Sequence, residues 1–272
     1  GLFAASGLIS IFEPVQDSLS GLTRAVESRV KEKASAILIA NPYHGAHSVE
    51  AKKLAAFLDS QDIKNSESIS VGILLDESMD VAAAVSLQKK LSGRNIAFIH
   101  AGFTDAGALV SKLGDTVMRS VHIFIDDKCS KLYRRHFSGQ TRILVKDGFE
   151  RRKNRDHPDL ESFSDLHVTF ADEGMKGFGD FLIVGDDFQE SGGPAYAVAI
   201  HLTFIDDSKD NEMFVFHFKS DRQDSPTDPA GKFAEALDKL VAAVNAPKSK
   251  ILKTSAVQEF LQLSAERHFP GL

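Results

Sequence analysis

Short apolar runs rich in β-branched residues recur along the chain, and the first six end 20 to 35 residues apart. Nine such runs are expected to be strands: 8–15, 35–42, 70–76, 95–100, 121–127, 141–148, 181–187, 197–206 and 213–220. Most of them carry apolar residues at consecutive positions rather than at alternating ones. Strands of this kind are buried on both faces, which is typical of a parallel sheet.

Amphipathic stretches separate the early runs. In residues 17–34, for example, apolar side chains recur every three or four positions, which predicts a helix. Alternating strands and helices build either an open doubly wound sheet or a closed barrel. Six or more units at this spacing favour the barrel, and no Gly-x-Gly-x-x-Gly follows the first run. The spacing therefore predicts a (β/α) barrel.

The pattern changes after Gly148. Residues 148–178 are polar and lack helical periodicity, so they are expected to form a long loop, and residues 197–220 are expected to form the hairpin. Residues 232–247 and 254–269 carry apolar stripes that predict two final helices. The expected organisation is one barrel-like domain over residues 1–272.

Composition limits the cellular setting. The chain has 272 residues, a net charge of −6 and one cysteine, Cys129, so no intramolecular disulfide can form. A single cysteine favours a reducing compartment. No apolar run reaches the roughly 18 residues of a spanning helix, and the N-terminus lacks the basic segment of a signal peptide. A cytoplasmic location without membrane contact is expected.

Polar residues close most of the runs, and in parallel α/β folds the reacting groups lie where strands end. Alternation within each run is expected to turn five of these side chains toward one rim: Glu13, Asn41, His100, Asp126 and Lys146. Asp76 fits the alternation less well but can join them. The stretch from Gly179 to Asp206 is expected to add Asp180, Asp186 and Asp187, with residues 192–194 turning the chain into the hairpin.

This rim predicts two kinds of chemistry. Carboxylates can hold a divalent cation such as Mg²⁺ or Mn²⁺, and the predicted metal ligands are Glu13, Asp76 and Asp126. The same rim suits acid–base work, with Glu13, Asp126, Lys146 and Asp180 as predicted catalytic residues. Acidic residues also end strands because they cap the helices that follow, and this reading stays open.

Positive charge is concentrated in the middle of the chain. Residues 128–155 contain ten basic residues and only two acidic ones, Asp147 and Glu150. Such a zone on an acidic protein is a candidate anion site. Arginine forks bind phosphate well, so the predicted ligand-binding set includes this zone and two polar rim positions. The full set is Asn41, His100, Arg151, Arg152, Arg155 and His201. Basic residues on solvated helix faces would give the same sequence pattern, so this alternative stays open. His157, Asp165 and His167 follow the zone and form a combination seen in metal sites.

Several segments carry a resemblance to a known family. Residues 11–15, 37–42, 142–167 and 177–206, together with the Gly179-Asp180-Phe181 stretch before a β-hairpin, resemble an uncharacterised bacterial family that is similar to the phage Beta-protein family. The resemblance covers most of residues 8–272. It implies a TIM-barrel-like (β/α) barrel with an added C-terminal β-hairpin and helices. It also implies a first strand and helix preceding residue 8, and genes on mobile elements beside a partner gene. It also implies a role in phage defence, but it supplies no reaction.

The sequence leaves two functions from different classes open. The first is a metal-assisted hydrolase or phosphodiesterase acting on a nucleotide or nucleic acid, which the acidic rim beside a basic zone favours. The second is a non-catalytic sensor or partner-binding subunit that works with a neighbouring effector protein. A glycosidase-like barrel is weaker, because the chain has no Trp and only three Tyr to stack on sugars.

Overall fold

The computed structural model describes residues 7–46, 52–181 and 196–271. Their contacts divide the chain into two compact units. Unit 1 comprises residues up to Lys146 together with residues 170–179, and unit 2 comprises residues 147–169 and 180 onward. The sequence pattern had predicted a single domain over residues 1–272. No helix among the described residues is both long and apolar enough to cross a membrane.

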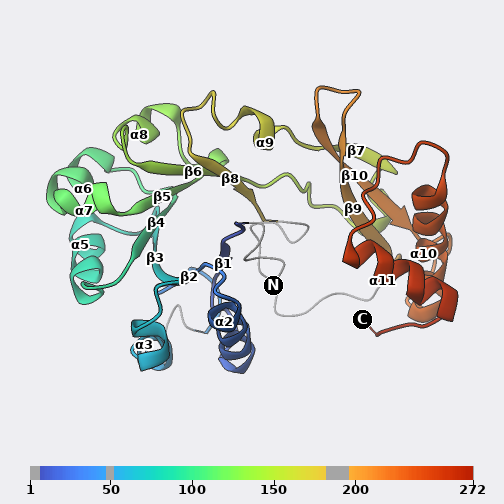
Figure 1. Ribbon diagram of the computed structural model, residues 1–272, viewed down its shortest axis with the longest axis horizontal. Coiled ribbons are helices and arrows are strands. Elements are labelled where there is room, and N and C mark those ends of the chain that lie inside the picture. Colours follow the sequence, from blue (N-terminus) through green and yellow to red (C-terminus); the bar gives the residue numbers. More distant parts are fainter. Residues whose placement is uncertain (1–6, 47–51, 182–195, 272) are drawn as a thin grey trace. The chain divides into compact units, whose positions relative to one another are not determined.

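Unit 1 contains a seven-stranded sheet flanked by helices (Figure 1). Its strands are β1 (Ser10–Phe12), β2 (Ala36–Ile39), β3 (Ile69–Asp76), β4 (Ile96–Ala101), β5 (Val121–Ile125), β6 (Thr141–Lys146) and β8 (Gly177–Asp180). Its helices are α2 (Ser20–Glu32), α3 (Lys52–Leu58), α4 (Gln61–Lys64), α5 (Val81–Lys90), α6 (Ala106–Leu113), α7 (Asp115–Arg119) and α8 (Lys131–Arg135), with a short 3₁₀ turn at Asp126–Lys128.

The strands lie side by side in chain order, β1-β2-β3-β4-β5-β6-β8. The pairs from β1 to β6 are all parallel. β8 continues this direction, because a Cβ added at Gly177 would meet Ile143 and one added at Gly179 would meet Val145. Sequential parallel order is the order of a barrel wall rather than of a doubly wound sheet. Within the described part of the chain β1 and β8 remain unpaired edges, so the α/β class with a parallel sheet is confirmed and a closed barrel is not.

Register determines which side chains share a face. Leu75, His100, Phe124 and Leu144 form one row across β3 to β6. The rings of His100 and Phe124 contact Tyr133 of α8 and Phe137 just beyond it, so this row faces the helices. The neighbouring row, Leu74, Ile99, Ile123 and Ile143, therefore faces away from the helices.

Unit 2 is built on a three-stranded antiparallel sheet in the order β7-β10-β9. β7 spans Leu160–Ser164, and β9 (Ala199–Asp206) and β10 (Glu212–Lys219) form a hairpin. The unit also contains a short 3₁₀ turn at Asn154–Asp156, α9 (Leu166–Thr169), α10 (Pro229–Asn245) and α11 (Ser255–Glu266). Residues 148–178, expected to be a loop, thus contain β7, α9 and the start of β8. Most of the strand expected at 181–187 lies outside the described residues.

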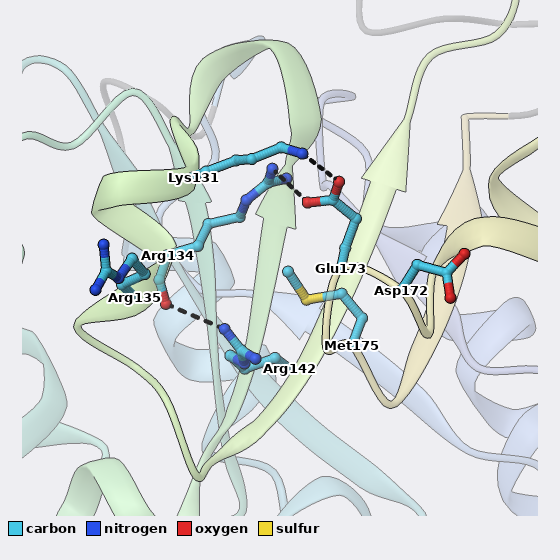
Figure 2. A pocket seen from close by; sticks show the side chains of 7 residues that line it. All are labelled: Lys131, Arg134, Arg135, Arg142, Asp172, Glu173 and Met175. Carbon is cyan, nitrogen blue, oxygen red and sulfur yellow. Dashed lines mark hydrogen bonds and ion pairs between the residues drawn. The ribbon is translucent and has the colours of Figure 1, made fainter.

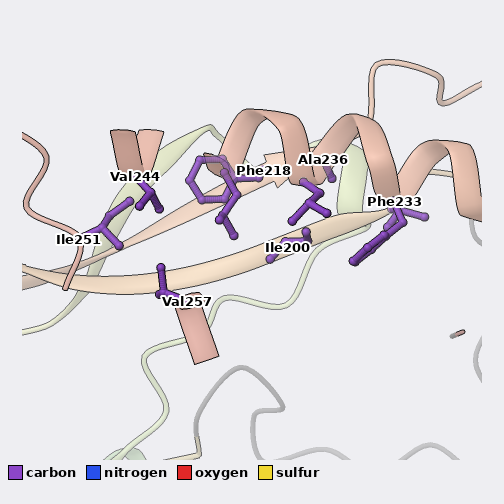
Figure 3. Packing of buried hydrophobic residues seen from close by; sticks show 10 residues of the cluster. Ile200, Phe218, Phe233, Ala236, Val244, Ile251 and Val257 are labelled. Carbon is purple, nitrogen blue, oxygen red and sulfur yellow. The ribbon is translucent and has the colours of Figure 1, made fainter. Parts of the chain in front are cut away.

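The core of unit 2 lies between one face of this sheet and the two C-terminal helices (Figure 3). Ile200 of β9 and Phe218 of β10 are register partners and pack against Phe233 and Leu237 of α10. Val257 of α11 completes the same cluster. α10 begins at an Asp228 cap, whose side chain accepts a hydrogen bond from the Gly231 amide, and Pro229 occupies the first turn. Residues of odd number on the hairpin face the opposite side.

Candidate functional site

Three histidines of unit 2 gather on the sheet face opposite the helices. His201 and His217 are register partners on β9 and β10. His157 comes from the segment before β7, 44 residues from His201 in sequence, and its ring stacks on that of His217 with centroids 4.3 Å apart. One ligand nitrogen from each imidazole lies within 4.8 Å of the other two. We call these three residues the histidine cluster.

Hydrogen bonds fix the orientation of two of the rings. Nδ1 of His201 and Nδ1 of His217 are 2.6 Å apart, so one nitrogen donates and the other accepts. On its other side His217 places Nε2 2.9 Å from Oε1 of Glu161 in β7. A carboxylate that accepts from one imidazole nitrogen directs the other nitrogen toward the centre of the cluster, as the outer partners of metal-binding histidines do.

His157 provides the unpaired group of the cluster. Its side chain is 1% exposed, yet Nδ1 has no hydrogen-bond partner among the described residues. The nearest carboxylate oxygen, Oε1 of Glu161, is 3.7 Å away, which is too long for a hydrogen bond. A buried polar nitrogen without a partner costs about 1–3 kcal/mol. Such a cost is expected to persist where the group has a ligand to bind.

All three imidazoles favour the neutral form. Burial lowers the pKa of His201 to about 4, and the neighbouring His217 and His157 add to this effect. Burial also lowers the pKa values of His217 and His157, although Glu161 partly opposes the shift in both. Neutral imidazole is the form that binds metal ions, because one ring nitrogen keeps a lone pair.

Charged residues surround the cluster on the side of β7. Glu161 also accepts two hydrogen bonds from Nη1 of Arg152, at 2.7 and 2.9 Å. Burial alone would raise the pKa of Glu161, but the hydrogen bonds and charge of Arg152 lower it, so the carboxylate stays ionised. Lys219 donates to the main-chain oxygen of His157 and lies 3.2 Å from Asp159. Phe149 closes one side, with its ring centroid 5.0 Å from that of His201.

The residues predicted for the rim divide between the two faces of the sheet in unit 1. Glu13, Asn41 and Asp76 follow the face turned away from the helices, as alternation from Ile11, Ile39 and Leu74 requires. His100, by contrast, lies in the row that faces the helices, and Asp126 contacts α8. Lys146 continues the same helix-facing row from Leu144. The expected convergence of all five side chains is therefore wrong.

Each described rim residue also has a structural partner. Oε1 of Glu13 accepts from the amides of Tyr43 and His44, at 2.7 and 3.0 Å. Oδ1 of Asp76 accepts from the amides of Ser78 and Met79, at 2.7 and 3.1 Å. Glu13 thus binds the segment that follows β2, and Asp76 closes the turn that follows β3. Asp180 is the last residue of β8, and Asp186, Asp187 and residues 192–194 lie outside the described part.

On the helix side of the sheet, the predicted residues form a buried network. Nδ1 of His100 is 2.7 Å from the Tyr133 hydroxyl, and Nε2 is 3.1 Å from Nδ1 of His122. Asp126 accepts from Nη1 of the buried Arg134 at 2.8 Å. These contacts give His100 a role in packing and Asp126 a role in ion pairing. Ligand binding by His100, and metal binding and catalysis by Asp126, stay predictions.

The basic zone is divided between the two units. Lys131, Arg134, Arg135 and Arg142 belong to unit 1, whereas Arg151, Arg152 and Arg155 belong to unit 2. Arg152 is half-buried and paired with Glu150 and Glu161, and Nε of Arg155 lies 3.5 Å from Asp156. Arg151 is exposed. The predicted clamp is thus partly neutralised by its own carboxylates.

The Asn41 side chain has a testable structural role. It extends the pairing of β2 with β3: Nδ2 donates to the Leu74 oxygen at 2.8 Å, and Oδ1 accepts from the Leu74 amide at 2.9 Å. Asn41→Ala leaves both Leu74 groups unpaired, so we expect it to lower the free energy of unfolding by about 1–3 kcal/mol. Urea unfolding measures the change. The exposed Asn65→Ala is the matched control, and an equally small effect of both variants would contradict this role.

Comparisons of the chain with protein-family models, curated protein sequences and solved structures found no match in any of the three. The histidine cluster therefore stands on its geometry. His201 was among the predicted ligand-binding residues, but the sequence did not place it in one site with His157 and His217. A signal was present, because a hairpin centred on Lys209 pairs position 201 with position 217.

Proposed function

We propose that the chain is a metal-assisted hydrolase whose metal ion is held by His157, His201 and His217. The observation that carries this proposal is the buried Nδ1 of His157, which has no hydrogen-bond partner among the described residues. It lies beside His217, which Glu161 orients, and His201, which hydrogen-bonds to His217. Three imidazoles favour Zn²⁺ or a related transition ion over Mg²⁺, which prefers oxygen ligands. This proposal moves the expected metal site from the rim of unit 1 to the sheet of unit 2.

Among the described residues the cluster offers three protein ligands, and this number supports a catalytic site over a purely structural one. Structural zinc sites have four protein ligands, whereas catalytic sites have three and keep one position open for water or substrate. A zinc ion held by these three residues would activate water as a nucleophile at neutral pH. In this chain Glu161 would hold His217 in position, and Arg152 would keep Glu161 charged.

The surroundings of the cluster favour a phosphodiester as substrate, in a nucleotide or nucleic acid. Four basic residues, Arg151, Arg152, Lys153 and Arg155, directly precede the proposed ligand His157. Lys219 is a fifth basic residue, and it contacts the main chain of His157. Arg152, Arg155 and Lys219 each pair with a carboxylate, so the positive charge beside the cluster is partly neutralised. Positive charge beside a metal ion stabilises the charge that develops on a phosphoryl group during hydrolysis.

A hydrolysis assay tests the catalytic part of the proposal. The full chain, loaded with Zn²⁺ or Mn²⁺, should hydrolyse bis(p-nitrophenyl) phosphate and short single-stranded oligonucleotides. His201→Ala should lose this activity, and His268→Ala, which replaces an exposed histidine of the same unit, should keep it. Metal binding without turnover of either substrate would reject the hydrolase and leave a metal-binding module.

Two broader proposals rest on sequence order and resemblance. We propose that unit 1 belongs to the (β/α)-barrel class, because its strands follow one another in chain order. From the resemblance to the bacterial family similar to the phage Beta-protein family, we propose a role in phage defence beside a neighbouring partner protein. Loss of phage resistance on deletion of the gene would support that role, and unchanged resistance would contradict it.

A further inference from the structure

A cavity of about 270 Å³ lies in unit 1, between α8, the start of β6 and the segment before β8 (Figure 2). The lining residues are Lys131, Arg134, Arg135, Arg142, Asp172, Glu173 and Met175. Four of them are cationic and two are acidic. The cavity is distinct in sequence and in unit from the histidine cluster, so the two proposals stand or fall separately.

Glu173 and Arg134 are already paired. Nζ of Lys131 lies 2.5 Å from Oε1 of Glu173, and Nη2 of Arg134 lies 3.4 Å from Oε2. Arg134 also donates to Asp126, and its side chain is only 5% exposed. A buried guanidinium needs such partners, because an unpaired buried charge is strongly destabilising. This network holds the wall of the cavity in place.

Arg142 carries a charge that no carboxylate neutralises among the described residues. Its Nη2 donates to the Gly174 oxygen at 2.7 Å, and Nη1 donates to the Arg134 oxygen at 3.4 Å. These main-chain oxygens fix the guanidinium but leave its charge and its other N–H groups available. Arg135, at the margin of the cavity, is exposed and has no ion-pair partner in the described ranges. Figure 2 shows the carboxylate of Asp172 turned away from Arg142.

We infer that this cavity binds a small phosphorylated anion, with Arg142 as its fixed donor and Arg135 and Lys131 as adjustable donors. A guanidinium presents paired N–H groups that match two phosphate oxygens. The volume is below the usual range of about 300–1,000 Å³ for drug-sized ligands, which favours phosphate itself or a short phosphomonoester. The Glu173 carboxylate holds Lys131, so it competes with the anion for that cation.

Calorimetric titration of the full chain at low ionic strength tests this inference, with inorganic phosphate and glycerol 3-phosphate as separate probes. Arg142→Gln should weaken binding at least about tenfold, since a hydrogen bond to a charged group contributes about 1.5–3 kcal/mol. Arg135→Gln should weaken it less, and Glu173→Gln should strengthen it. Arg24→Gln, at an exposed position on α2, is the matched control and should bind like the wild type.

The two probes distinguish the source of the anion. Tighter binding of glycerol 3-phosphate would identify a phosphomonoester, and binding of inorganic phosphate alone would identify the free ion; both results support the inference. Equal affinity of wild type and Arg142→Gln, or no saturable binding of either probe, would overturn it. Should Arg142→Gln fail to fold, unchanged affinity in the exposed Arg135→Gln variant would overturn it as well.

Discussion

His201→Ala should weaken the binding of Zn²⁺ by at least about a hundredfold, because it removes one of three proposed protein ligands. His201 is the most accessible of the three, and among the described residues it hydrogen-bonds only to His217, so its loss should leave the fold of unit 2 intact. Competition against a chromophoric chelator measures the affinity. His268→Ala should bind Zn²⁺ as the wild type does, and a parallel loss in that control would show that the metal binds elsewhere.

Replacing Glu161, which hydrogen-bonds to His217, should weaken the binding of Zn²⁺ less than replacing His201 does. Glu161→Gln keeps the shape of the side chain but removes the charge that holds His217 in position at 2.9 Å. Losses of about 10–100-fold in metal affinity are typical when such a partner is replaced. Equal losses in Glu161→Gln and His201→Ala would argue that the cluster is held together by general packing and not by ligand geometry.

Acid should destabilise unit 1 through the buried pair His100 and His122. Burial lowers the pKa of His122 from 6.5 to about 4, and it lowers that of His100 as well. The unfolded chain therefore takes up these protons first as the pH falls below about 6.5, while the native state does not. The free energy of unfolding should fall from about pH 6.5, and the part of this loss that comes from His122 should level off below about pH 4. His122 alone accounts for about 3 kcal/mol of this loss.

The slope of stability against pH isolates this contribution. Urea unfolding between pH 7 and pH 4 should show a slope about 1.4 kcal/mol per pH unit shallower in His122→Leu than in the wild type. His136→Leu, an exposed histidine in the same unit, serves as the control. Tyr133 and Cys129, which contact His100, stay protonated here because burial raises both pKa values, that of Cys129 to about 11. Identical slopes in all three proteins would contradict the prediction.

The strands of unit 1 could be predicted because they are buried on both faces. The runs at 70–76, 95–100, 121–127 and 141–148 match β3 to β6, with boundaries that differ by at most two residues. Burial on both faces also leaves no sequence pattern that shows which side chains face the helices and which face away from them. Ile99 and His100, for instance, are both buried, so no alternation of polar and apolar residues marks the helix side. That is why the predicted rim joined residues from opposite faces.

The histidine cluster was harder to predict because it depends on a long-range contact. The hairpin places His201 beside His217 by local register, but His157 reaches them only because β7 pairs with β10. Residues 148–178 lack the alternation of apolar and polar residues that would predict β7, because only Leu160 and Phe163 of that strand are apolar. Polar residues that weaken a strand signal can thus be the ones that build a site.

The metal centre is tested most directly by X-ray absorption at the zinc edge on the full chain loaded with one equivalent of Zn²⁺. The spectrum should show three imidazole nitrogens at about 2.0–2.1 Å and one oxygen ligand in the fourth position. His157→Ala should lower the number of imidazole ligands. If the protein takes up no stoichiometric zinc, or if its spectrum is the same in His157→Ala, His157, His201 and His217 form only part of the packed interior and the proposed metal centre is wrong.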